Sequence, residues 1–279
     1  MEQVIATSRA GWWQARLEAT PPLAWLALQA AALWVHWRWA AARVADGSDD
    51  PLGVVALAVL IGFVVHAARD LRGRPRPGPL ALALGLSVAA TASVFAAPPL
   101  AGALLAALAL AAGLRAFMPS GRAFLPLAGL AVLALPVLSS LQFYAGYPLR
   151  LVTAQLSTWG LQLAGIAAAR SGTAMQVEGR LVIVDAPCSG VQMVWMAYFC
   201  ACTMAALIGL PDRRFVRALP WIGVLVLLGN TLRNGVLVML EARRSMVPEH
   251  VHEGVGLLVL ALVCAGVIAI VRGGRDERA

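Results

Sequence analysis

Long apolar runs separated by arginine-rich turns constrain the fold of this chain more than any other feature. Several runs reach about 18–20 residues, the length that a helix needs to cross the hydrocarbon core of a bilayer. Of the 279 residues, 60% are hydrophobic and only 13% are charged, which is far from the composition of a soluble domain. We therefore predict an all-α, polytopic helical membrane bundle that forms one integral membrane domain over residues 1–279. About eight transmembrane helices are expected, at 23–41, 51–68, 79–97, 100–116, 123–141, 189–210, 218–240 and 254–271.

The distribution of basic residues predicts the orientation of these spans. All 22 basic residues are arginine, and they lie in short clusters between apolar runs, which does not favour a nucleic-acid partner. With both termini in the cytoplasm, 14 arginines fall in inner segments, 6 fall in outer loops, and Arg38 and Arg233 lie within spans. Because basic loops stay on the cytoplasmic side, this count predicts a multi-pass membrane protein with both termini in the cytoplasm. We expect no removable signal peptide.

Residues 142–188 are more polar than the spans on either side. We interpret them as an extracytoplasmic or interfacial segment, with a polar-aromatic loop at 142–150. An amphipathic helix at 151–169 is expected to lie on the membrane or partly in it. The pattern from Met175 to Asp185 predicts a short hairpin that turns at Glu178-Gly179. This hairpin-like stretch would deliver Cys188 to the outer membrane surface.

Cys188 and Arg233 are the two residues with the clearest chemical potential. Cys188 lies outside the apolar runs that contain the other three cysteines, and a helix opened by Ser189 would favour its thiolate form. The alternative is a small residue that only packs at a helix start. Arg233 lies about 10 Å below the outer end of its span at 1.5 Å per residue, where an arginine is costly unless it serves a function. An ion pair with Asp185 or Glu253, or extension toward the surface, would also explain it.

Asn230, His250 and His252 could complete a site with these two residues. Asn230 lies one helical turn before Arg233, so it could orient the guanidinium or donate to an oxyanion; it could equally hold two helices together. Either histidine could act as a base for the thiol, or be a simple interfacial residue. A metal site made of Cys188 and both histidines lacks a fourth ligand. We therefore expect neither a metal nor a cofactor.

Three short motifs follow one another in the second half of the chain. They are Cys188-Ser189-Gly190, Asn230-Thr231-Leu232-Arg233 and His252-Glu253-Gly254-Val255-Gly256. With about eight spans and the hairpin-like stretch before the cysteine, this chain resembles the exosortase/archaeosortase family of membrane transpeptidases. The resemblance implies a catalytic core within 120–272. Pro187 departs from the family pattern, and because His250 also has a glycine four residues on, the choice between the two histidines stays open.

The resemblance implies a membrane-embedded cysteine protease or transpeptidase with its active site on the extracytoplasmic face. Its partners would be the lipid bilayer and exported proteins with C-terminal sorting signals (PEP-CTERM-like), built from a short motif, a span and an Arg-rich tail. Cys188 would form a thioester, His252 would act as base and then acid, and Arg233 would stabilise the oxyanion. Asn230, Ser189 and His250 would have supporting roles. The alternative from a different class is a non-enzymatic transporter or an assembly factor for envelope polysaccharide.

Overall fold

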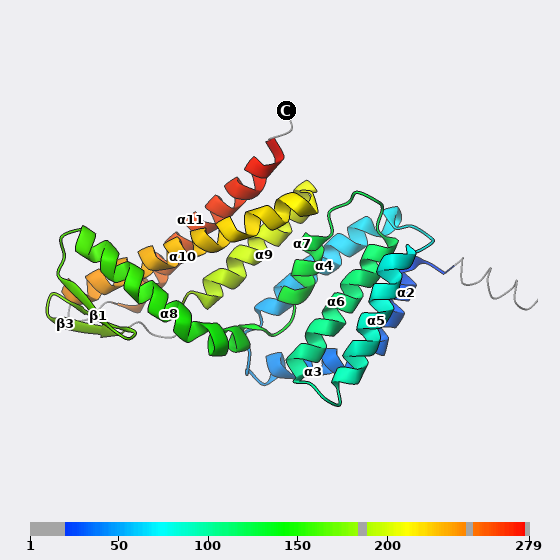
Figure 1. Cartoon of the computed structure of the whole chain (residues 1–279), viewed down its shortest axis with the longest axis horizontal. Coiled ribbons are helices and arrows are strands. Elements are labelled where there is room, and N and C mark those ends of the chain that lie inside the picture. Colours follow the sequence, from blue (N-terminus) through cyan, green and yellow to red (C-terminus); the bar gives the residue numbers. More distant parts are fainter. Residues whose placement is uncertain (1–19, 184–188, 244–247, 277–279) are drawn as a thin grey trace, which may run out of the picture. The chain divides into compact units, whose positions relative to one another are not determined.

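The computed structural model describes residues 20–183, 189–243 and 248–276. It divides into two compact units, one ending at Pro136 and the other beginning at Val137. Helices form almost all of the described structure, and one small sheet lies in the second unit (Figure 1). The predicted all-α class is therefore confirmed. The expected domain limits, 1–279 for the whole and 120–272 for the core, stay predictions.

The first unit packs around one helix that is rich in small residues. Its helices are α2 (Pro22–Ala32), α3 (Trp34–Ala45), α4 (Leu52–Ala67) with the short η1 (Ala68–Asp70), α5 (Pro77–Ser93), α6 (Pro99–Phe117) and α7 (Leu125–Leu133). Most buried residues of α6 are alanine or glycine, and α6 contacts α2, α3, α5 and α7. Small side chains allow such close approach where the hydrophobic effect does not drive helices together.

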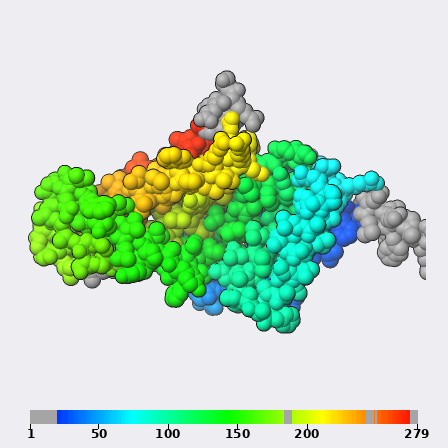
Figure 2. All heavy atoms as spheres, viewed as in Figure 1, coloured from blue at the N-terminus to red at the C-terminus, as the bar shows by residue number. Residues whose placement is uncertain are grey.

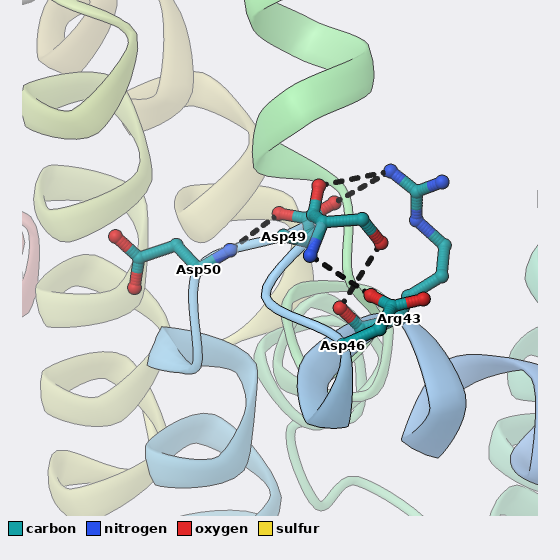
Figure 3. A network of polar contacts seen from close by, with 5 residues as sticks. Arg43, Asp46, Asp49 and Asp50 are labelled. Carbon is teal, nitrogen blue, oxygen red and sulfur yellow. Dashed lines mark hydrogen bonds and ion pairs between the residues drawn. The ribbon is translucent and has the colours of Figure 1, made fainter.

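The turn between α3 and α4 is held by its own acidic side chains (Figure 3). The fully buried carboxylate of Asp49 lies 3.9 Å from the guanidinium of Arg43. The pKa of the Asp46 carboxyl is lowered by hydrogen bonding from Ser48, first from its side chain and then from its backbone N–H, which donates to Asp46 Oδ1 at 2.9 Å. Asp50 accepts the N–H of the first residue of α4 at 3.0 Å. The acidic residues of this loop therefore form their contacts within the turn itself.

The second unit contains four helices and the sheet. They are α8 (Leu138–Leu163), β1 (Ala168–Ser171), β2 (Ala174–Val177), β3 (Arg180–Ile183), α9 (Val191–Ile208), α10 (Asp212–Arg243) and α11 (Glu249–Asp276). α10 contacts the other three helices, and Figure 1 shows it running beside α11. In the space-filling view, the atoms of α8 and the strands lie at the surface of this unit (Figure 2).

The expected loop at 142–150 is wrong, because these residues belong to α8. Phe143, Tyr144 and Tyr147 are exposed on the surface of the helix. The buried residues recur at helical spacing, as shown by Gly146, Thr153, Ala154, Ser157, Thr158 and Leu161. The amphipathic helix expected at 151–169 is correct only to Leu163, because β1 begins at Ala168.

The hairpin predicted at Glu178-Gly179 is confirmed in the described residues. β2 and β3 pair in antiparallel fashion, with Val177 opposite Arg180. Glu178 and Gly179 both have positive φ, at 50° and 83°, as a tight type I′ hairpin turn requires. β1 adds a third strand that the sequence did not predict, in the order β1-β2-β3.

By length and composition, fewer than eight of the described helices qualify as candidate membrane spans. Five described helical segments are long and apolar enough to span a bilayer: Leu52–Asp70, Pro99–Phe117, Val191–Ile208, Asp212–Glu241 and His250–Gly273. α7 and α8 follow one another along the chain and become a sixth candidate only if they are counted together. α2 and α5 are apolar but shorter, and the span expected at 23–41 is divided at Leu33. The polytopic architecture is confirmed, whereas the count of eight is not.

Candidate functional site

The middle of α10 presents polar side chains to two different neighbours. Asn230 donates to Thr153 Oγ1 of α8 at 3.1 Å, and Asn234 donates to Ser157 Oγ, also at 3.1 Å. Both asparagines are buried, and residues four apart share one face of a helix. Arg233 is rotated by about 100° from Asn234, so its side chain leaves that face and contacts α11. The two hydrogen bonds to α8 therefore fix the rotation of α10 about its own axis, and this rotation directs the Arg233 side chain toward α11.

Gly190, the glycine of the first motif, lies directly against Asn230. A Cβ placed on Gly190 would lie 2.7 Å from Asn230 Cγ, which is too close for any side chain. Gly190 also has φ of +83° and precedes the first residue of α9, a conformation that glycine adopts at little cost. This position accordingly requires glycine for two independent reasons.

Ser189 is held in place by a hydrogen bond to α8. Its hydroxyl donates to Gln142 Oε1 at 2.8 Å, and it is almost fully buried. The expectation that Ser189 opens the helix is only approximately met, because α9 begins at Val191 and Gly190 is its N-cap. The two residues that follow Cys188 are nevertheless held by contacts with α8 and α10.

Gly256, the glycine of the third motif, lies against the guanidinium of Arg233. A Cβ on Gly256 would be 3.2 Å from Arg233 Nε and 3.5 Å from Nη2. Gly256 is one helical turn after His252 on α11, so the two share a face. By contrast, a Cβ on Gly254 would meet nothing within 4 Å. The close approach of α10 and α11 at this point gives the third motif a physical reason for its glycine.

His252 is paired with a carboxylate from the end of α10. Its Nε2 lies 3.0 Å from Glu241 Oε1, and about two thirds of each side chain is buried. His250 is exposed at the start of α11. A carboxylate that accepts a hydrogen bond from an imidazole fixes the orientation of the ring, as in the Ser-His-Asp arrangement.

Cys188 lies outside the described residues, as does Asp185, one of the two acidic residues considered as an ion-pair partner of Arg233. Among the residues that the structure describes, no group of three or more His, Cys, Asp or Glu side chains is arranged to hold a metal ion. In the first unit, a hollow of about 420 Å³ lies beside His36 and Arg38, and it is lined by none of the motif residues.

The described parts of all three motifs therefore meet around α10. α9 provides Gly190 at its start, α10 provides Asn230 and Arg233, and α11 provides His252 and Gly256. Sequence reasoning missed Glu241 and Gln142 as contact residues. Glu241 could have been found from its place near the end of one span, opposite a histidine at the start of the next. Gln142 could not, because it was assigned to a loop.

The helices and this cluster define a polytopic membrane protein with polar groups gathered where three adjacent helices meet. The chain belongs to the transmembrane exosortase family, whose sequence pattern matches residues 12–269. The resemblance inferred from the three motifs is thereby confirmed over most of the chain. Comparisons with curated proteins and with solved structures gave no significant match.

Proposed function

We propose that this chain is a cysteine transpeptidase or protease of the inner membrane that cleaves the C-terminal sorting signals of exported proteins. The observation that carries the proposal is the meeting of the three motifs around α10. Gly190 contacts Asn230, Gly256 contacts Arg233, and His252 pairs with Glu241. A motif set that served only as packing would not need a guanidinium, an imidazole and a carboxylate within neighbouring helices.

In the proposed reaction, the Cys188 thiolate attacks the carbonyl carbon of the scissile peptide bond. A C–S bond forms and the oxygen becomes an oxyanion, which Arg233 stabilises with its planar fork of N–H donors. The tetrahedral intermediate collapses, the C–N bond breaks, and the leaving amine takes a proton from His252. The product is a thioester on Cys188 and a released tail.

The second half of the reaction restores the Cys188 thiolate and the protonated His252. Water or the nucleophilic group of an acceptor attacks the thioester carbon while His252 removes its proton, and the C–S bond breaks. Glu241 orients the imidazole for both proton transfers. Asn230 lies one turn from Arg233, so it is close enough to orient the guanidinium or to donate to the same oxyanion.

The substrate proposed for this reaction is an exported protein that ends in a short Pro-containing motif, an apolar span and an Arg-rich tail. The test uses a reporter of that design, reconstituted in liposomes with the full chain. Wild-type protein should release the tail, and Cys188→Ala should not. Cys264→Ala is the matched control and should cleave normally. Equal cleavage by Cys188→Ala and wild type would contradict the proposal.

A further inference from the structure

The small sheet of the second unit has one face buried and one face exposed. Met175, Val177 and Val182 form a buried cluster with Val238 of α10 and with residues of α8. Leu181 points to the opposite face and is 69% exposed. Since the sheet order is β1-β2-β3, β1 and β3 are its two edge strands.

The alternation of hydrogen-bonded residues along each strand identifies which peptide groups face outward from β3. Glu178 donates its backbone N–H to Ala167 at 3.0 Å, so even-numbered residues of the β2 segment bond to β1. Odd-numbered residues consequently bond to β3, and their partners are Arg180 and Val182. Bonded and non-bonded pairs alternate in an antiparallel ladder. The N–H and C=O groups of Leu181 and Ile183 therefore point away from the sheet.

The two edge strands differ in the contacts that they make on their outward sides. On β1, the Ala168 carbonyl accepts a hydrogen bond from Gln162 of α8 at 2.8 Å, and the Arg170 side chain bonds Gln155 of the same helix at 2.8 Å. On β3, no strand within 20–183, 189–243 or 248–276 pairs with the outer edge. An edge with unpaired peptide groups can accept an additional strand.

We propose that the outer edge of β3 binds the extended segment of the substrate that precedes the scissile bond, by addition of a strand to the sheet. This inference rests on the proposed function. β3 ends at Ile183 and Cys188 follows five residues later in the chain, so the end of β3 lies within about 18 Å of the proposed nucleophile, the reach of five extended residues. Backbone hydrogen bonds would provide the affinity, as in other cases of strand addition.

The direction of the added strand follows from the same placement. The chain leads from the C-terminal end of β3 to Cys188, and the substrate segment before the scissile bond must also end at Cys188. The substrate strand therefore runs parallel to β3. Recognition through peptide groups depends little on side-chain identity, so exported proteins with different sequences before the cleavage point can share this edge.

Hydrogen exchange tests the proposal without any change to the sheet. Full-length Cys188→Ala protein in nanodiscs is mixed with the tailed reporter, and with the same reporter lacking its tail as control. The Leu181 and Ile183 amides should exchange about tenfold more slowly with the tailed reporter, near the upper end of what one hydrogen bond contributes. The Arg180 and Val182 amides, already bonded to β2, and the outward Ala168 amide should not change.

A proline at the edge gives a second, kinetic test. Leu181→Pro removes an outward N–H but no bond to β2, a position where an edge strand tolerates proline. KM for the reporter should rise about tenfold with kcat unchanged, because the lost contact binds ground state and transition state alike. Ala168→Pro, on the opposite edge of the sheet, is the matched control and should stay within about twofold of wild type.

The possible outcomes separate this proposal from the function on which it rests. If wild-type protein cleaves the reporter but the Leu181 and Ile183 amides stay unprotected, the edge proposal is wrong and the proposed function stands. If the reporter is neither captured nor cleaved, both fail. Protection that rises with protein concentration in the absence of reporter would identify a second copy of this chain as the occupant, and would also overturn the proposal.

Discussion

Gly256 of α11 lies against the guanidinium of Arg233 of α10, so that a Cβ at position 256 would be 3.2 Å from Nε. Gly256 belongs to the same helical face as His252, which pairs with Glu241 at 3.0 Å. The third motif thus combines a polar residue, His252, with a glycine, Gly256, that leaves space for the Arg233 side chain of the second motif. Two helices of a membrane bundle can approach closely where one of them carries glycine.

Replacing Gly256 by alanine should lower turnover without unfolding the protein. The new methyl group would shift the guanidinium by a few tenths of an ångström, and misplacement of catalytic groups on the ångström scale costs up to about a hundredfold. We expect a loss of about tenfold in kcat/KM for the reporter. Alanine is the better helix former, so membrane levels should be unchanged.

Gly254→Ala is the matched control, because a Cβ there meets nothing within 4 Å. It should cleave the reporter at the wild-type rate. The pair also decides between the two histidines, since Gly254 follows His250 by four residues and Gly256 follows His252. Loss of activity in Gly254→Ala with normal activity in Gly256→Ala would assign the base to His250.

Replacing Gly190 by alanine should damage both stability and activity. The backbone there has φ of +83°, and the added Cβ would lie 2.7 Å from Asn230 Cγ. Gly209→Ala is a control for the backbone cost alone, because Gly209 has φ of +64° and no atom near its Cβ position. Each left-handed alanine should cost about 1–2 kcal/mol.

The thermal midpoint of unfolding should therefore fall further for Gly190→Ala than for Gly209→Ala. Only Gly190→Ala should lower reporter cleavage in the protein that remains folded, since only that residue touches a motif side chain. Equal midpoints and equal cleavage in the two variants would show that the contact with Asn230 has no consequence.

Replacing Glu241 by glutamine tests the carboxylate–imidazole pair. Glutamine keeps the shape of the side chain but loses the charge that stabilises an imidazolium. Its amide can also turn its NH2 group, in place of an oxygen, toward the ring. Turnover should fall about tenfold or more, as expected for a residue that orients a catalytic base. Glu253→Gln, next to His252 in the chain and exposed, should have little effect on the measured kcat.

Reporter fusions test the predicted orientation of the chain. Fusions after Arg76, Arg217 and Ala279 should report the cytoplasm, and a fusion near Arg180 should report the outside. The number of crossings depends most on whether α7 and α8 count together as one span. An outside signal after Arg217 combined with a cytoplasmic signal near Arg180 would reverse the proposed face of the site.

The motif residues could be found from the sequence because each motif consists of a few adjacent residues. The hairpin at Glu178-Gly179 could be predicted for the same reason, since a tight turn depends on adjacent residues. The contacts Gly256–Arg233 and Glu241–His252 depend on how α10 packs against α11, and a linear pattern does not contain that information. The loop assigned to 142–150 failed because its exposed aromatic residues lie on one side of α8, while Gln142 bonds Ser189 at 2.8 Å on another.

The most direct test of the proposed cysteine chemistry is the detection of a thioester on Cys188. Wild-type protein is mixed briefly with the tailed reporter in liposomes, denatured in acid and examined by mass spectrometry. We predict a covalent adduct of the cleaved reporter on the peptide that contains Cys188, released by hydroxylamine and absent from Cys188→Ser. Serine should fail because its hydroxyl is far less ionised than a thiol near neutral pH. The proposed cysteine chemistry would be contradicted if Cys188→Ala cleaved the reporter at the wild-type rate and neither wild type nor Cys188→Ala carried an adduct.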